Sequence, residues 1–380
     1  MEAAEFESVL ATVRDFVREV VVPAEDEIEE TDEIPTRIRE QAKAMGLFGY
    51  AIPEEYDGLG LTMSEEVRLA MELGWTTPSF RSLFGTNNGI AGQVVAKNGT
   101  PEQKQHYLPR FASGELVASF ALSEPEAGSD PSWMRTSAKP DGDGWVIDGA
   151  KQYITNATRA DVFKVFARTS GERGTTKGIS VFVVPADAEG LRIGPNDPKM
   201  GQRGSSTAEV SFDGVRVVAS TLVGGQEGVG FGAAMKSLAK GRLHIAAICV
   251  GLAQRMLDES IRWATASRQG ETRIADFQLV QGMLADCHTE IYAGRAMVLE
   301  AAREYDEGTD QRLAPSAAKL YCSEMVGRVA DRAVQVHGGA GYMHSVPVER
   351  FYRDARLFRL YEGTSEVQRV IIAKAITRSR

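Results

Sequence analysis

Residues 145–147 read Trp-Val-Ile, and four further runs rich in β-branched and aromatic residues follow at 162–166, 179–184, 210–212 and 215–218. Runs of this kind, separated by turns rich in Gly and Asp such as Asp141-Gly142-Asp143-Gly144, are typical of β-strands. The pattern begins beyond Gly114. The sequence therefore predicts a small β domain in the middle of the 380-residue chain.

Helical patterns stand on both sides of these strands. In the N-terminal third, apolar residues recur at helical spacing from Phe6 to Val20, and Pro23 is expected to end this first helix. Helical periodicity continues to about Ala112, and Thr100-Pro101-Glu102-Gln103 has the residues of a helix start. From Gly232 onward, long amphipathic stretches are typical of a helix bundle. Because the helices flank the strands and do not alternate with them, a parallel doubly wound sheet is not expected.

The composition is that of a globular protein with a sizeable core, since 43% of the residues are hydrophobic. A net charge of -9 argues against a nucleic-acid or anionic-membrane surface, and no apolar run approaches the length of a membrane span. The three cysteines are far apart in sequence, so we expect free thiols in a reducing compartment. The acidic start resembles neither a secretory signal nor a transit peptide. A cytoplasmic protein is expected, with the mitochondrial matrix after transit-peptide removal as the alternative.

Several common chemistries lack their motifs. The five histidines show no metal-ligand spacing, so no metal site is expected. There is no Walker A sequence, and Gly228-Val229-Gly230-Phe231-Gly232 does not follow a strand and open a βαβ unit. Any nucleotide cofactor must therefore bind to an architecture other than a Rossmann fold.

Four segments concentrate polar and small residues. Residues 120–130, Phe-Ala-Leu-Ser-Glu-Pro-Glu-Ala-Gly-Ser-Asp, lie at the helical-to-β boundary, where Gly128 would allow close approach of the backbone to a ligand. Residues 151–156, Lys-Gln-Tyr-Ile-Thr-Asn, add a ring that could stack on a flat cofactor. The others are 199–207, Lys-Met-Gly-Gln-Arg-Gly-Ser-Ser-Thr, and 361–369, Tyr-Glu-Gly-Thr-Ser-Glu-Val-Gln-Arg. Each of the first two, taken alone, also fits an ordinary loop or strand end.

In their order and separation, these segments resemble the acyl-CoA dehydrogenase family, and the resemblance covers essentially the whole chain. It implies an α+β fold with an N-terminal α-helical domain at 1–117, a middle β-barrel-like domain at 118–222 and a C-terminal four-helix bundle at 223–380. This is the helix, strand, helix order that the patterns predict, and agreement between the two levels supports both.

The resemblance implies an oxidoreductase that uses FAD to convert an acyl-CoA thioester to the trans-2-enoyl-CoA, in fatty-acid or amino-acid catabolism such as β-oxidation. An electron-transfer flavoprotein would accept the electrons. FAD-binding positions implied on one subunit are Phe120, Leu122, Ser123, Gly128, Ser129, Tyr153, Ile154, Thr155, Thr364 and Glu366. Positions implied to reach the FAD of a neighbouring subunit are Arg268, Gln278, Gln335, Val336, Gly338 and Gly339. A shared site requires a homo-oligomer, expected to be a tetramer built as a dimer of dimers.

By the same resemblance, Glu362 is the base that takes the alpha proton, while flavin N5 takes the beta hydride. Its own backbone N–H and a flavin hydroxyl would polarise the thioester carbonyl, and Gly363 suits a tight backbone against the thioester. Burial in an apolar pocket is expected to raise the pKa of Glu362. Some relatives carry the base immediately before the residue that matches Arg242. Here that residue is Gly241, so no carboxylate competes with Glu362 at this position.

Implied substrate-binding positions are Ser129, Gly363, Arg81 and Arg242, the last on the path of CoA and pantetheine. The Asp often found three residues before the matching Arg is Ala239 in this chain, which leaves the contact made by that Asp open.

Two features bear on the acyl group. Phe80-Arg81-Ser82 resembles the segment by which glutaryl-CoA dehydrogenases bind a distal carboxylate. Their acidic residue seven positions earlier is Gly74 here, and similar Phe-Arg pairs occur in relatives with ordinary acyl substrates. A short or branched acyl group is therefore favoured, and a dicarboxylyl group is the alternative.

Two other functions stay open. An oxidase or flavin monooxygenase of the same fold would react with oxygen at the reduced flavin, although the retained Glu362 favours dehydrogenation. A non-catalytic acyl-CoA-binding protein would keep the fold without the flavin. The sequence does not define the acyl chain length or the pathway.

Overall fold

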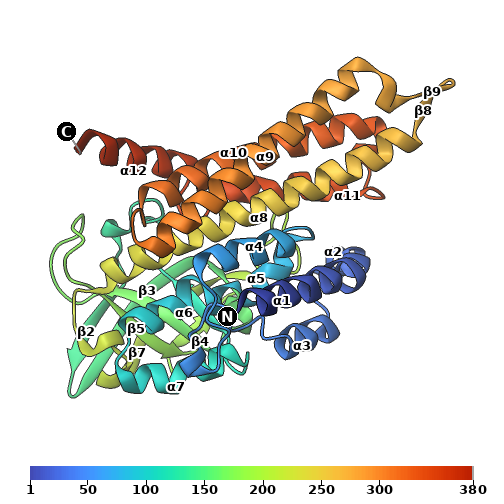
Figure 1. Ribbon diagram of the computed structural model, residues 1–380. Helices are drawn as coiled ribbons and strands as arrows, with labels where there is room; N and C mark the ends of the chain where they lie inside the picture. The colour runs from blue at the N-terminus through green and yellow to red at the C-terminus, as the bar shows by residue number, and fades with distance from the viewer. Residues whose placement is uncertain (379–380) are drawn as a thin grey trace.

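The computed structural model describes residues 1–378, which form a helical part, a sheet and a second helical part in chain order (Figure 1). The first part consists of short helices packed on one another and on the long helix that follows the sheet. These are α1 (Ala3–Phe16), α2 (Glu25–Thr31), α3 (Thr36–Ala44), α4 (Met63–Leu73), α5 (Pro78–Asn88), α6 (Ile90–Asn98) and α7 (Pro101–Ala112).

The middle part is a mixed seven-stranded sheet with the order β1-β4-β2-β3-β7-β6, in which β5 pairs with β4. Most pairs are antiparallel, but β1 and β2 both run parallel to β4. The strands are β1 (Ala118–Ala121), β2 (Ser137–Asp141), β3 (Gly144–Thr155), β4 (Val162–Arg168), β5 (Ile179–Pro185), β6 (Leu191–Ile193) and β7 (Thr207–Val218). All five predicted runs lie in strands. Some of their buried side chains form a core within the sheet, and others, such as Phe166 and Val181, pack in a second cluster with residues of α6 and α7.

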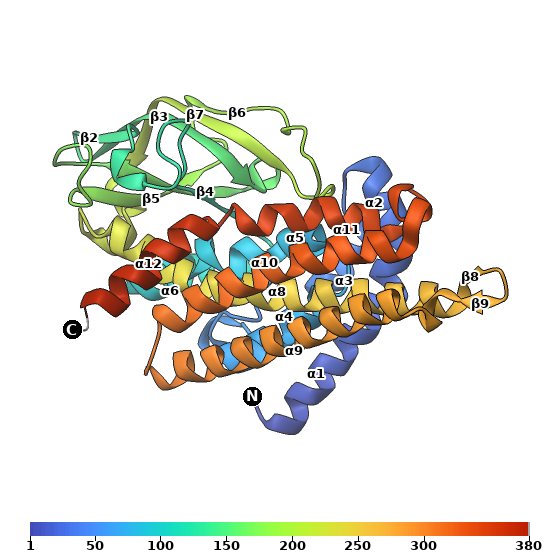
Figure 2. The same cartoon turned by 90° about the horizontal axis from the view of Figure 1, so that it is seen from above.

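Long helices make up the last part, and in Figure 2 the three longest lie alongside one another. They are α8 (Gly230–Ala266), α9 (Gln278–Glu307) and α10 (Leu313–His337), followed by α11 (Pro347–Ala355) and α12 (Ser365–Arg378). A small hairpin of β8 (Arg268–Gln269) and β9 (Thr272–Arg273) joins α8 to α9. The predicted fold class is confirmed, and the domain boundaries at 117/118 and 222/223 stay predictions.

The prediction that Pro23 ends the first helix is wrong. After α1 the chain continues through a π-helical turn, Val17–Val21, and a 3-10 turn, Val22–Ala24, directly into α2. Proline lacks an N–H and so cannot donate a backbone hydrogen bond. At the start of a helical turn the N–H groups make no hydrogen bond within the helix, so a proline there loses none. The proline therefore changes the type of helical turn without ending the helical path.

Thr100 caps α7 as predicted. Its hydroxyl accepts a hydrogen bond from the N–H of Gln103, and the Gln103 side chain accepts one from the N–H of Thr100. This reciprocal arrangement satisfies two N–H groups that the first helical turn leaves free. It fixes the last helix before the sheet.

Within residues 1–378, no helix is long and apolar enough to cross a membrane. The same residues contain no group of three or more His, Cys, Asp and Glu side chains placed to hold a metal ion. Cys249, Cys287 and Cys322 are buried free thiols.

One buried lysine gives a test of packing in the sheet. Lys164 on β4 is fully buried, its Nζ has no hydrogen-bond partner among residues 1–378, and it lies 5.2 Å and 4.6 Å from the ring centroids of Tyr107 and Phe111. Burial lowers the pKa of Lys164 to about 7. Lys164→Met is therefore expected to raise the free energy of unfolding by about 2 kcal/mol at pH 7.

The sign of the pH dependence follows from proton binding. Between pH 7 and about 10.4 the unfolded state holds more protons on Lys164 than the native state, so the native wild type gains stability as pH rises. The advantage of Lys164→Met must shrink over the same range. Denaturant unfolding of both proteins at pH 7 and at pH 9.5 measures this, and a gain that does not change with pH would contradict the burial of a charged lysine.

Candidate active site

Glu362 occupies a strained turn between α11 and α12. Its backbone φ is 52°, and that of Gly363 is 91°. An L residue adopts such a left-handed conformation only where its surroundings hold it there. On the C-terminal side, the Thr364 hydroxyl accepts a hydrogen bond from the N–H of Val367 and so caps α12. No acceptor for the Glu362 N–H is found among residues 1–378, which leaves this donor available to a ligand.

The side chain of Glu362 fills the space that Gly241 leaves on α8. A Cβ at position 241 would overlap Oε2 of Glu362 and lie 3.0 Å from its Cδ. Oε2 is buried and has no hydrogen-bond partner within the described chain. The carboxylate of Glu362 therefore lies at the position from which some relatives are expected to supply their base.

Burial raises the pKa of Glu362, as the sequence predicted. The positive charges of Arg81, Lys319 and Arg242 act in the opposite direction. A carboxyl group balanced in this way suits a general base, because it is more basic than a free Glu and is still held near cations that favour its ionised form.

Arg81 on α5 and Arg242 on α8 are buried, and neither makes an ion pair within residues 1–378. The Nε of each also lacks a hydrogen-bond partner there. With Ala239 three residues before it, Arg242 has no carboxylate at that position on its own helix. Buried guanidinium groups without an anion are costly, so both are candidates for binding a negatively charged ligand.

The middle-domain residues proposed to hold the flavin lie together. Gln152 on β3 donates its N–H to the carbonyl of Ser123 at 2.9 Å, which joins the first two motifs. Tyr153 has a left-handed backbone and a side chain that is 66% exposed, so its ring is available for stacking. At the end of β3, Asn156 donates to the carbonyl of Ser82 at 2.8 Å and so ties Thr155 to the helix that carries Arg81.

A flat, polar cofactor fits this surface. Phe120 lies on β1, and Leu122 and Ser123 follow directly after this strand. Ile154 and Thr155 end β3, and the side chain of Ile154 is buried beneath the surface. Gly128 and the exposed Ser129 belong to the following loop, and a Cβ on Gly128 would meet no atom within 4 Å. Thr364 and the exposed Glu366 stand at the start of α12, next to the Glu362 turn.

Sequence reasoning missed the ion pair that supports this surface. Lys151 is fully buried on β3, and its Nζ lies 2.7 Å from Oε1 of Glu124 and 3.2 Å from the carbonyl of Leu122. The carboxylate of Glu124 also accepts the N–H groups of Arg135 and Thr136. The available signal was the single lysine of the second motif and the three acidic residues of the first, since a buried lysine needs a buried acid.

The remaining cofactor residues lie far from this surface on the same chain. They sit around the β8–β9 hairpin and the end of α10, which in Figures 1 and 2 is the end of the C-terminal helices farthest from the sheet. They are Arg268, Gln278, Gln335, Val336, Gly338 and Gly339. All but the buried Val336 are exposed, so they are free to contact a second copy of the chain.

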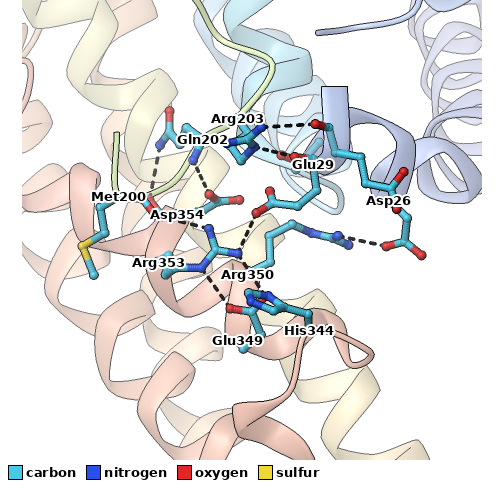
Figure 3. Close-up of polar contacts among 12 residues, drawn as sticks. Asp26, Glu29, Met200, Gln202, Arg203, His344, Glu349, Arg350, Arg353 and Asp354 are labelled. Atoms are coloured by element: carbon cyan, nitrogen blue, oxygen red, sulfur yellow. Dashed lines mark hydrogen bonds and ion pairs between the residues drawn. The ribbon is translucent and has the colours of Figure 1, made fainter. Parts of the chain in front are cut away.

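The third motif fastens the three parts of the chain together (Figure 3). The N–H of Gln202 donates to Oδ1 of the buried Asp354 on α11, and Arg203 donates to the carbonyl of Glu29 on α2. Arg353 completes the junction with hydrogen bonds to the Met200 carbonyl at 3.2 Å and to Oε1 of Glu29 at 2.8 Å. The same Gln202 faces the hydroxyl of Tyr361, the residue before the proposed base. This junction is structural and sets the position of the Glu362 turn.

Comparison with known proteins places the chain in a family. The acyl-CoA dehydrogenase N-terminal domain matches residues 3–115, the middle domain matches 119–215 and the C-terminal domain matches 228–377. Among relatives, a 3-(aryl)acrylate reductase of Clostridium sporogenes is 36% identical over 95% of both chains, and the caffeyl-CoA reductase-Etf complex subunit CarC of Acetobacterium woodii is 37% identical over 95% of both. A probable acyl-CoA dehydrogenase of Bacillus subtilis is 39% identical over 96% of both.

Solved structures agree in fold. A chain in the structure of the electron transferring flavoprotein of Acidaminococcus fermentans superposes with a TM-score of 0.95 at 33% identity, over 100% of this chain and 99% of that one. Glutaryl-CoA dehydrogenase of Mycobacterium smegmatis gives a TM-score of 0.92 at 32% identity, over 100% and 96%. The fold and the relatives are thus those of a flavoprotein oxidoreductase. The chain belongs to the acyl-CoA dehydrogenase family.

Proposed function

We propose that this protein catalyses the FAD-dependent α,β-dehydrogenation of an acyl-CoA thioester, with Glu362 as the base. The observation that carries the proposal is Oε2 of Glu362, which is buried, lacks a hydrogen-bond partner within residues 1–378 and lies over Gly241, while the positive charges of Arg81 and Arg242 act on the carboxylate. A group in that state is available to accept a proton from a bound substrate.

Each residue of the site has a separate role in the proposed reaction. Glu362 takes the proton from the alpha carbon, and the electrons of that C–H bond form the double bond as hydride leaves the beta carbon. The free N–H of Glu362 donates to the thioester oxygen, where negative charge develops. Arg242 binds the anionic CoA portion. When bound, FAD supplies the hydride acceptor.

The distribution of cofactor residues supports a homo-oligomer. Arg268 and Gln278 lie at the far end of the helices from Tyr153, so one chain offers two separate half-sites. We propose that two copies complete each FAD site, within a tetramer built as a dimer of dimers. The relative in an Etf complex supports an electron-transfer flavoprotein as the electron acceptor. Three buried free thiols suit a reducing compartment such as the cytoplasm.

Anaerobic reduction of the purified flavoprotein by a panel of straight, branched, aryl and dicarboxylic acyl-CoAs tests the reaction class. Bleaching of the flavin by at least one of them, with slow reoxidation in air, is the expected result. Rapid reoxidation with release of peroxide would indicate the oxidase instead. Protein that takes up no FAD would point to a non-catalytic binding protein.

A dicarboxylyl-CoA is the second candidate substrate, because a buried cation lacks its anion. Arg81 folds back over Gly85, where a Cβ would lie 2.8 Å from its Cζ. Beside it, the Tyr50 hydroxyl lies 2.7 Å from Nε2 of His244, whose Nδ1 has no partner among the described residues. His244 stands one helical turn after Gly241 on α8, so an acyl group that passes Glu362 would reach this polar cluster.

Gly74 stands at the position where glutaryl-CoA dehydrogenases carry an acidic residue, and it has no side chain to take over the role of that residue. A Cβ there would lie 2.5 Å from the carbonyl of Ile248, so α4 and α8 approach too closely for a side chain. In this chain, Arg81 and the Tyr50–His244 pair would have to bind the distal carboxylate without a second acid.

Arg81→Met separates the two substrate classes. If the acyl group ends in a carboxylate, the substitution should lower kcat/KM for glutaryl-CoA by about 10²-fold or more, since a buried charge pair is lost. The kcat/KM for butyryl-CoA should then change by no more than a few-fold. Equal losses for both substrates, with wild type preferring butyryl-CoA, would favour the short or branched acyl group.

A further inference from the structure

The turn that carries the proposed base needs support from outside itself. Glu362 and Gly363 are consecutive residues with positive φ, and only Gly363 adopts such a conformation without steric cost. A non-glycine residue held there costs of order 1 kcal/mol, so contacts from neighbouring elements must stabilise it. Two buried side chains make those contacts.

Lys319 on α10 is the first of them. It is fully buried, and its Nζ donates a hydrogen bond to the carbonyl of Gly363 at 2.7 Å. Gln368 on α12 is the second, and its Nε2 donates to the carbonyls of Gly363 at 2.9 Å and Glu362 at 3.2 Å. Both carbonyls of the turn are therefore fixed by side chains that solvent does not reach. A carbonyl shares its peptide plane with the N–H of the next residue, so these hydrogen bonds hold the two peptide planes that follow the Glu362 Cα and thereby the position from which its side chain starts.

The charge of Lys319 is a separate observation. A neutral donor would satisfy the Gly363 carbonyl, whereas a buried ammonium carries a large desolvation penalty. That penalty lowers the pKa of Lys319 to about 8, and the nearby Cys249 and Glu362 oppose the shift. The Lys319 cation also acts on Glu362: burial raises the pKa of the Glu362 carboxyl group, and the positive charge of Lys319 lowers it. The charged or titratable groups around the pair are Arg81 on α5, Arg242 and Cys249 on α8, Glu324 on α10, and Tyr361.

We propose that Lys319 is a positioning residue for the reaction. It holds the Glu362–Gly363 turn, and with it the Glu362 carboxylate over Gly241, in the place from which the carboxylate can take the alpha proton, and its charge favours the ionised form of that carboxylate. Lys319 does not contact the reacting atoms and acts through Glu362. This inference rests on the proposed role of Glu362 as the base.

Lys319→Met tests both parts, with Lys319→Arg as the conservative variant. Loss of the hydrogen bond should misplace the turn and lower kcat by about 10²-fold, with KM changed by less than about threefold. Loss of the cation raises the pKa of Glu362, so the acidic limb of the kcat–pH profile moves to higher pH. Lys319→Arg keeps the charge and should restore the limb and part of kcat.

Lys164→Met is the matched control, because it makes the same change at a buried lysine in the sheet, where no residue of the turn lies. It should leave kcat and the pH profile unchanged. FAD content and the unfolding midpoint are measured for each variant. If the loss in Lys319→Met follows loss of FAD or of folded protein, or if Lys319→Arg does not restore the limb, Lys319 is only structural and the proposal fails.

Glu362→Gln separates this failure from failure of the proposed function. If Glu362→Gln is inactive while Lys319→Met retains normal kcat and an unmoved pH limb, only the role of Lys319 is wrong. If Glu362→Gln is itself active, the base assignment is wrong and the inference falls with it.

Discussion

Glu362→Gln is expected to lower kcat for acyl-CoA oxidation by about 10³-fold or more, because an amide cannot accept the alpha proton. The amide has nearly the size of the carboxyl group, so it should occupy the same space over Gly241. The backbone of the turn is held by Lys319 and Gln368 and not by the carboxylate. FAD binding, acyl-CoA binding and the unfolding midpoint should therefore stay close to those of the wild type.

Stopped-flow reduction of the bound flavin under anaerobic conditions measures the chemical step directly. Glu259→Gln is the control, since Glu259 is also a buried glutamate but is paired with Arg255 at 2.8 Å, away from the turn. It should reduce the flavin at a rate within a few-fold of wild type. Flavin reduction by Glu362→Gln at a comparable rate would refute Glu362 as the base.

Much of the fold follows from local sequence, because its features are set by nearby residues. Runs of β-branched and aromatic residues predicted the strands around Trp145 and Val181, and the Thr100 capping box needs only four consecutive residues. Pro23 was misjudged because a proline stops a helix only where its missing N–H or its ring conflicts with the preceding turn. The change to a π-helical turn that avoids this conflict is not visible in the residue pattern.

The surroundings of Glu362 could be predicted only in part. Its motif identified the residue, and Gly241 indicated that no second base was present, but only the structure shows the carboxylate lying over that glycine. Tyr50 and His244 are 194 positions apart, and Lys319 and Gly363 are 44 apart. Neither spacing follows a helical or strand period, so no sequence pattern brings these residues together. These residues meet through long-range packing, of the loop after α3 on α8 and of α10 on the turn before α12.

The space at Gly241 leads to the second large effect. Gly241→Ala should lower kcat by about 10²-fold without loss of stability, because the added methyl group and the Glu362 carboxylate cannot occupy the same position. The overlap involves the end of a flexible side chain, so the carboxylate rotates away while the backbone stays in place. Alanine also favours the helix that glycine weakens. A displaced carboxylate remains ionisable, and only its distance from the alpha carbon changes.

Gly282→Ala is the matched control, since it makes the same change in α9 at a glycine whose Cβ would meet no atom within 4 Å. It should leave kcat unchanged. The decisive measurement is the double variant Gly241→Ala/Glu362→Gln. If the methyl group acts only by moving the base, it has no further effect once the base is an amide, and the double variant should reduce flavin no more slowly than Glu362→Gln. If the two losses multiply instead, Gly241 acts on acyl-CoA binding by a route that does not pass through Glu362.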